Sequence, residues 1–125
     1  MNNRTVIVIT GPTASGKTSL GVSLALALGT EVVSADSMQL YRGMDIGSAK
    51  PTREEMRGVP HHMIDVADPV EDYSVSRWVE NAAACCDALL AGGKTPVIVG
   101  GTGLYIDSLI AGRTFQQFPA APHLG

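Results

Sequence analysis

The chain contains the stretch Gly11-Pro12-Thr13-Ala14-Ser15-Gly16-Lys17-Thr18 directly after the apolar run Val6-Ile7-Val8-Ile9. Leu20, Leu24 and Leu28 follow at helical spacing. A strand, a glycine-bounded loop that ends in Gly-Lys-Thr, and a helix form the arrangement that cradles a di- or triphosphate. The sequence therefore predicts a phosphate-binding loop (P-loop) over residues 11–18, rather than an ordinary glycine-rich turn.

Each part of this loop has a physical role in holding phosphate. Successive backbone N–H groups from about Ala14 to Thr18 are expected to point into one concavity, and the following helix adds the positive end of its dipole. Gly11 and Gly16 allow a close backbone approach that a Cβ would hinder. Lys17 brings a point charge to the terminal phosphate, and Thr18 is a candidate ligand for Mg²⁺. The pattern indicates a polyphosphate end and does not identify the molecule that carries it.

Strands and helices alternate along the chain, which predicts an α/β fold: a P-loop NTPase-like parallel sheet flanked by helices. Thr52 and Ser74 are expected N-caps, and Gly29 is an expected helix stop. We expect strands at about 5–10, 31–35 and 96–99, and helices at about 17–28, 52–57, 74–91 and 103–111. In such sheets ligands bind at the carboxyl ends of the strands. Three loops should therefore meet at one cleft, namely residues 11–18, the segment from Asp36 onward, and residues 100–103.

Length and composition fit a single domain, with 125 residues of which 45% are apolar. Three strands are few for this fold, and the chain ends in Pro-Ala-Ala-Pro-His-Leu-Gly. We therefore expect a core over residues 1–115, an unstructured or truncated tail over 116–125, and a fragment of a longer protein. Alone, such a fragment should be marginally stable or aggregation-prone, because its strand edges lack partners.

Composition also limits the class of protein. No apolar run approaches the length of a membrane span, and the few residues before Thr5 leave no room for a secretory signal, so a cytoplasmic protein is expected. The net charge of −3 argues mildly against a nucleic-acid footprint on this chain. Cys85 and Cys86 are adjacent on an expected helix, which suits neither a disulfide nor a metal pair.

Several other side chains allow more than one interpretation. Asp36 ends the second expected strand, where a carboxylate could hold Mg²⁺ through water, act as a general base or cap the following turn. His61 and His62 lack a third ligand at a useful spacing, so a structural turn after Pro60 is favoured over a metal site. Trp78 belongs to an apolar helix stripe and should lie in the core. Two tyrosines could either stack on bases or pack in the core, namely Tyr41 and Tyr105.

Further motifs accompany the P-loop: Ser34-Ala35-Asp36-Ser37-Met38-Gln39-Leu40-Tyr41, Gly43-Met44-Asp45-Ile46-Gly47-Ser48-Ala49-Lys50-Pro51 and Val99-Gly100-Gly101-Thr102-Gly103-Leu104-Tyr105. Together they closely resemble the tRNA dimethylallyltransferase (isopentenyl-tRNA transferase) family, and Val59-Pro60-His61-His62-Met63-Ile64-Asp65 looks like its continuation. The resemblance covers about residues 4–115. Much the same motifs recur in adenylate isopentenyltransferases, so the acceptor stays open between tRNA and a free adenine nucleotide.

The resemblance implies transfer of a dimethylallyl group from dimethylallyl diphosphate to N6 of an adenine beside the anticodon, with the tRNA anticodon arm as partner. The P-loop, with Thr13 and Ser15, would line the diphosphate site, and Lys17, the loop amides and Mg²⁺ on Thr18 would neutralise the leaving group. Asp36 would accept the N6 proton. The remaining contacts to the flipped-out base and the tRNA would come from Ser37, Met38, Gln39 and Thr102.

Two other classes of function remain open. In a small-molecule kinase, ATP would fill the P-loop and Asp36 would activate a hydroxyl. A non-catalytic nucleotide-binding module, or a truncated remnant, is the second. The strand Val97-Ile98-Val99 leads into glycines without a clear Walker-B acid, which weakens an ATP-hydrolysing interpretation. The family's helical insertion and C-terminal part, which embrace the anticodon arm, are not in this chain, so catalysis by these 125 residues alone is not expected.

Overall fold

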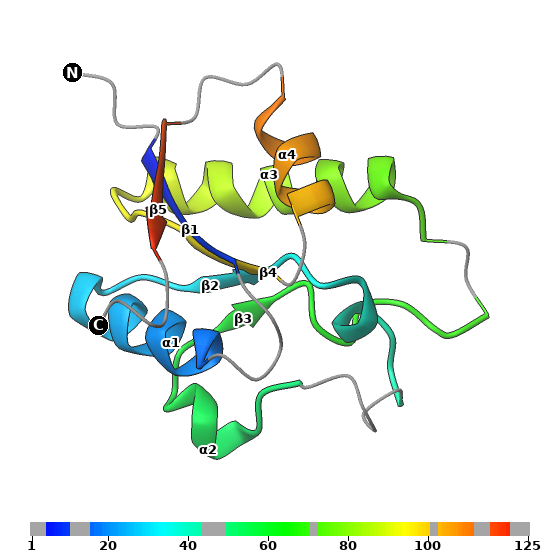
Figure 1. Ribbon diagram of the computed structural model, residues 1–125, viewed down its shortest axis with the longest axis horizontal. Helices are drawn as coiled ribbons and strands as arrows, with labels where there is room; N and C mark the ends of the chain where they lie inside the picture. The colour runs from blue at the N-terminus through cyan, green and yellow to red at the C-terminus, as the bar shows by residue number, and fades with distance from the viewer. Residues whose placement is uncertain are drawn as a thin grey trace.

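The computed structural model describes residues 5–10, 16–43, 50–70, 73–100, 103–111 and 116–120. These residues form a five-stranded sheet in the order β3-β2-β4-β1-β5, and every pairing in it is parallel (Figure 1). The strands are β1 (Thr5–Thr10), β2 (Val32–Ser34), β3 (His61–His62), β4 (Val97–Gly100) and β5 (Gln116–Ala120). The predicted parallel α/β fold is confirmed.

The helices form where local sequence signals favour them: α1 (Lys17–Leu28), α2 (Arg53–Met56), α3 (Val75–Ala91), α4 (Gly103–Ile110) and a 3-10 turn, η1 (Ser37–Leu40). Ser74 caps α3 by accepting a hydrogen bond from the backbone N–H of Arg77 at 3.1 Å. Thr52 and Glu55 form a reciprocal capping box on α2. Gly29 ends α1 in the left-handed region, with φ of 64°. These three predicted helix boundaries are confirmed.

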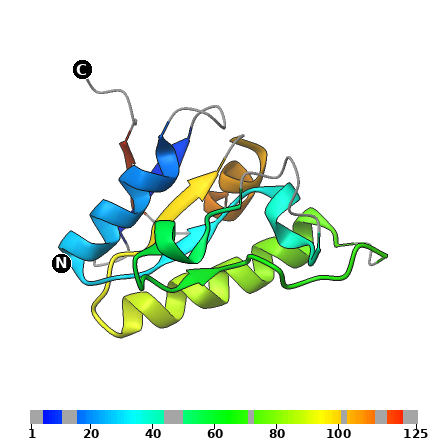
Figure 2. The same cartoon turned by 90° about the horizontal axis from the view of Figure 1, so that it is seen from below.

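Strand alternation divides the core into two layers. On one face of the sheet, Val8, Val33 and Ile98 pack against α3 and α4, with the fully buried Trp78 at the centre. On the other face, Ile9 and the odd-numbered β4 residues pack against α1. Figures 1 and 2 show α3 and α4 covering one side of the sheet, with α1 and α2 on the other. Because β2 follows the same alternation, Val32 and Ser34 point to the α1 side.

The buried face of α1 differs from the leucine stripe that the sequence suggests. Its buried apolar contacts come from Val22 and Ala25, while Leu28 is 48% exposed. Gly21 explains why this face of the helix lies against the sheet, because a Cβ at position 21 would lie 2.8 Å from Cγ2 of Val99. The helix therefore packs its small residues on the sheet, and its leucines lie at the margin or in solvent.

Two sheet edges correct the sequence-based expectations. Residues 116–120 were expected in an unstructured tail, yet they form β5 and pair with β1. Pro119 is unusual in a strand, so the sequence pattern does not predict β5. A proline is tolerated here because β5 lies at the edge of the sheet. His61 and His62 were expected in a turn, yet they form β3 and pair with Val32 and Val33. The sequence predicts three strands, and the described residues form five.

The aromatic and cysteine side chains mostly belong to the core. Trp78 is buried, as predicted, and Tyr105 lies against it with ring centroids 4.8 Å apart, so Tyr105 packs in the core. Tyr41 is half-buried at the margin of the same cluster. Both cysteines are free thiols, with Cys86 buried and Cys85 half-buried. Within the described segments no helix has the length and apolar character of a membrane span.

Candidate functional site

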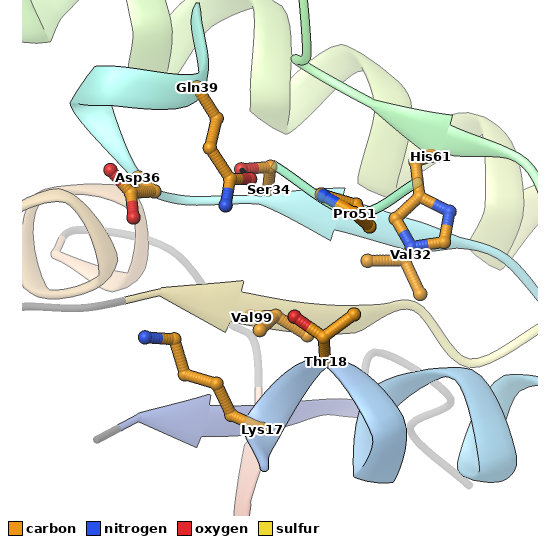
Figure 3. A pocket seen from close by; sticks show the side chains of 9 residues that line it. All are labelled: Lys17, Thr18, Val32, Ser34, Asp36, Gln39, Pro51, His61 and Val99. Atoms are coloured by element: carbon orange, nitrogen blue, oxygen red, sulfur yellow. Dashed lines mark hydrogen bonds between the residues drawn. The ribbon is translucent and has the colours of Figure 1, made fainter. Parts of the chain in front are cut away.

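A pocket on the α1 side of the sheet brings together residues from distant parts of the chain (Figure 3). Its floor comes from β2 and β4, one wall from the start of α1, and the facing wall from η1, β3 and the segment before α2. The lining residues are Lys17, Thr18, Val32, Ser34, Asp36, Gln39, Pro51, His61 and Val99. Four of the predicted site residues therefore share one pocket, namely Lys17, Thr18, Asp36 and Gln39.

The start of α1 forms one wall of the pocket. Gly16 precedes the helix with φ of 81°, a backbone conformation that favours glycine. Among the described residues no side chain caps this helix, and its first turn has no acidic residue. The N-terminus of a helix favours an anionic group. Lys17 is only 5% exposed and lines the pocket with Thr18. A fixed cation, a hydroxyl and a helix N-terminus thus converge on one wall.

Asp36 lies across the pocket from Lys17 (Figure 3). It follows β2, whose end is held to β4 by a hydrogen bond from the Ala35 N–H to the Val99 carbonyl, 2.7 Å long. Asp36 is half-buried. Burial raises the pKa of the Tyr105 phenol, and the charges of nearby groups including Asp36 raise it further. The carboxylate is therefore fixed at the end of a central strand, facing the cationic wall.

Gln39 enters the pocket from η1 and is held at several points. Its backbone N–H donates to the Asp36 carbonyl at 3.1 Å, and its carbonyl accepts from the Asp65 N–H at 3.0 Å. In the side chain, Oε1 accepts a hydrogen bond from the Ser34 hydroxyl at 2.8 Å. The amide nitrogen points into the pocket, toward the α1 wall (Figure 3). Hydrogen bonds therefore hold both the backbone and the side-chain oxygen of Gln39.

His61, Pro51 and Ser34 also line the pocket, although the sequence pattern did not single them out as site residues. Nδ1 of His61 contacts the Val59 carbonyl oxygen at 2.8 Å, and the other ring nitrogen lies toward the pocket floor (Figure 3). Burial lowers the pKa of His61 below its ordinary value of 6.5, and the nearby His62 lowers it further, against the effect of the Val59 hydrogen bond. The parallel pairing of β3 with β2 brings His61 into the wall of the pocket that faces α1.

Other predicted site residues lie outside the pocket or outside the described residues. Ser37 is exposed on η1 and is not among the lining residues. Met38 lies on the same turn, and its side chain is not described. Two predicted sets lie outside the described residues, namely positions 11–15 (Gly11, Pro12, Thr13, Ala14 and Ser15) and Thr102.

Charged groups near the pocket are engaged in local pairs. Lys50 donates to the Tyr41 carbonyl and to Asp65, both at 2.6 Å, which ties the segment before Pro51 to the one that holds η1. Arg42 pairs with Asp68 at 2.9 Å. Among the described residues, no group of three or more His, Cys, Asp or Glu side chains could hold a metal ion.

Comparisons with known proteins show which family the chain is similar to. The sequence profile of the IPP transferase family matches residues 39–124. The tRNA dimethylallyltransferase of Desulforudis audaxviator is 56% identical over 110 residues, covering 88% of this chain and 36% of the relative. That of an Exiguobacterium species is 53% identical over 119 residues, covering 95% of this chain and 38% of the relative.

Solved structures resemble the fold as well. The full-length tRNA isopentenylpyrophosphate transferase of Bacillus halodurans has a TM-score of 0.84 at 50% identity, covering 89% of this chain and 37% of that one. A eukaryotic dimethylallyltransferase acting on tRNA has a TM-score of 0.82 at 35% identity, covering 89% of this chain and 28% of that one. The chain thus spans little more than a third of the length of the curated relatives named above.

Proposed function

Because the chain belongs to the IPP transferase family, we propose that it forms the part of a tRNA dimethylallyltransferase that holds dimethylallyl diphosphate and activates the acceptor base. The observation that carries this proposal is the shared pocket in which the start of α1 faces Asp36. A diphosphate on Lys17 and the α1 N-terminus would leave its allylic carbon near the middle of the pocket. The acceptor base would enter on the side of Asp36 and Gln39.

The proposed reaction exchanges one bond for another. The carbon–oxygen bond of the allylic diphosphate breaks, and a bond forms between that carbon and N6 of the adenine. The N6 proton passes to the Asp36 carboxylate, and inorganic diphosphate leaves. Lys17 and the first amides of α1 neutralise the charge that develops on the departing oxygen, which is usually the largest contribution in sites of this kind.

Mg²⁺ fits the pocket as a partner of the substrate. Thr18 lines the pocket beside Lys17, and its hydroxyl would be the protein ligand of the ion. Mg²⁺ is usually bound by few protein groups, with water and phosphate oxygens completing its shell. When bound, the ion would add positive charge at the diphosphate.

The remaining roles follow from the motifs and stay part of the proposal. Thr13 and Ser15 would line the diphosphate site. Ser37 and Met38 would contact the flipped-out base or its neighbours, with Gln39 on a hydrogen-bonding edge of the base and Thr102 at the tRNA. The acceptor is the tRNA anticodon arm, which would place the reaction in the cytoplasm.

The test uses the complete protein that carries this segment, incubated with tRNA, dimethylallyl diphosphate and Mg²⁺. Mass spectrometry should find a dimethylallyl gain on an adenosine beside the anticodon. Asp36→Asn should lower transfer by about 10²–10⁴-fold, the usual contribution of a general base, and leave pyrophosphate binding nearly intact. Asp107→Asn, at an exposed aspartate on α4, is the matched control and should transfer normally.

Three results would contradict the proposal. Unchanged turnover in Asp36→Asn would remove the assignment of the base. A gain on free adenosine monophosphate and none on tRNA would favour an adenylate isopentenyltransferase. Transfer of a phosphoryl group from ATP to a small acceptor would favour a kinase.

A further inference from the structure

Ser34 joins the core on one face of the sheet to the pocket on the other. It is 3% exposed and lies on the pocket floor. Its backbone carbonyl accepts a hydrogen bond from Nε1 of the buried Trp78 at 3.2 Å. Its hydroxyl donates to Oε1 of Gln39 at 2.8 Å. The leaving-group and general-base roles described above do not account for a hydroxyl at this position.

We propose that Ser34 is a positioning residue that holds the side-chain amide of Gln39 with its nitrogen toward the acceptor base and its oxygen away from it. The inference rests on the proposed function and deepens it. A donor at this point selects a base that has a hydrogen-bond acceptor opposite Gln39. Each adenine ring nitrogen outside the glycosidic bond is such an acceptor.

A carboxamide is nearly symmetric in shape. Its oxygen and nitrogen ends are almost alike in shape, so hydrogen bonds decide which end points where. With Oε1 accepting from Ser34, the nitrogen points into the pocket (Figure 3). In the opposite orientation the amide nitrogen would donate to the Ser34 oxygen, and the buried Ser34 hydroxyl proton would lose the acceptor it now has, which is costly.

The backbone of Gln39 is held in place independently of its side-chain amide. Its backbone is bonded at both ends, to Asp36 through its N–H and to Asp65 through its carbonyl. Ser34 is equally rigid, because its backbone is part of β2 and its carbonyl is held by Trp78. Both partners of the hydroxyl–amide bond are therefore held in place.

The experiment measures kcat/KM of the complete protein with an anticodon-arm RNA hairpin and dimethylallyl diphosphate. Ser34→Ala should lower kcat/KM for the hairpin by about two- to tenfold, the range of one neutral hydrogen bond, and leave KM for dimethylallyl diphosphate unchanged. The double variant Ser34→Ala/Gln39→Ala should be no slower than Gln39→Ala alone, because the two residues act through one contact. Ser76→Ala, at an exposed serine on α3, is the matched control.

A second comparison does not depend on the fold of the Ser34 variant. Gln39→Glu keeps the side-chain shape and replaces the donor with an oxygen, so it should lose at least as much as Gln39→Ala. Hairpins that carry 1-, 3- or 7-deazaadenine at the target position each lack one ring nitrogen. The unmodified protein should discriminate against at least one of them, and Ser34→Ala should lose much of that discrimination.

Wild-type kcat/KM and wild-type discrimination in Ser34→Ala would overturn the inference, as would full activity of Gln39→Glu. The same variants and hairpins are compared in binding, followed by fluorescence anisotropy. A protein that binds the hairpins without transferring the group would reject the proposed function, and the binding comparison would still decide the role of Ser34.

Discussion

Gly100 lies so close to Ala35 that a Cβ added to Gly100 would be 2.9 Å from both the Cβ atom and the carbonyl oxygen of Ala35. This contact joins the end of β4 to the residue that directly precedes Asp36. The spacing between β2 and β4 at the edge of the pocket therefore depends on residue 100 being a glycine, which has no side chain.

Replacing Gly100 should consequently destabilise the protein. In Gly100→Ala the new methyl group meets a backbone oxygen, which cannot move without disturbing β2. We expect the free energy of unfolding to fall by about 1–3 kcal/mol, the usual cost of overpacking, measured by urea denaturation. Gly92→Ala is the matched control, because its Cβ would lie at an ordinary 3.5 Å from the Leu89 carbonyl oxygen. Equal effects of the two changes would contradict the close packing.

Lys17 should contribute strongly to diphosphate binding. Lys17→Met keeps the aliphatic stem and removes the charge, so the lost interaction is that of one charged hydrogen bond, about 1.5–3 kcal/mol. Calorimetry with pyrophosphate and Mg²⁺ should show a Kd raised by roughly 10- to 150-fold. Lys94→Met is the matched control, because Lys94 is outside the pocket and lies 3.7 Å from Glu31. This variant should bind pyrophosphate as the unmodified protein does. Unaltered binding in Lys17→Met would exclude this role.

His61 should make stability fall in mild acid. Burial lowers the pKa of folded His61 below 6.5, so between the two pKa values the unfolded chain binds more protons than the folded one. The His61 contribution is therefore absent well above pH 6.5 and becomes destabilising as the pH falls. His61→Asn should lose less stability than the unmodified protein between pH 7.5 and pH 5, measured by urea denaturation. An identical pH dependence would contradict this.

The two cysteines should react differently with iodoacetamide. Burial raises the pKa of the Cys85 thiol, and the charge of Glu31 raises it further, so little thiolate is present at pH 8. Cys86 is buried and should react only after unfolding. Mass spectrometry should therefore find slow labelling of Cys85, almost none of Cys86, and fast labelling of both in urea. Rapid labelling of Cys86 in the folded protein would show that α3 is not packed as described.

The helices of this protein could be predicted because their signals are local. Ser74 and Thr52 cap the helices that follow them, and Gly29 ends α1, each through contacts within a few residues. Strand β1 and the glycine-bounded loop after it are similarly short-range patterns. The expected meeting of Lys17 and Asp36 followed from one general rule, that the carboxyl ends of parallel strands share an edge.

The remainder of the site depends on contacts between residues far apart in the chain. Ser34 bonds to Gln39 only because η1 folds back over β2, and His61 reaches the pocket wall only because β3 pairs with β2. Strand β5 was missed because the sheet edge, and not its own sequence, stabilises a segment that contains Pro119.

From the sequence alone came the helices, the start of α1 as one wall of the site and the carboxylate that faces it, because each depends on backbone preferences of neighbouring residues. The tertiary structure decided the strand order, the buried face of α1 and the remaining walls of the pocket. These depend on packing and hydrogen bonds between segments whose distance in space is not encoded in any local pattern.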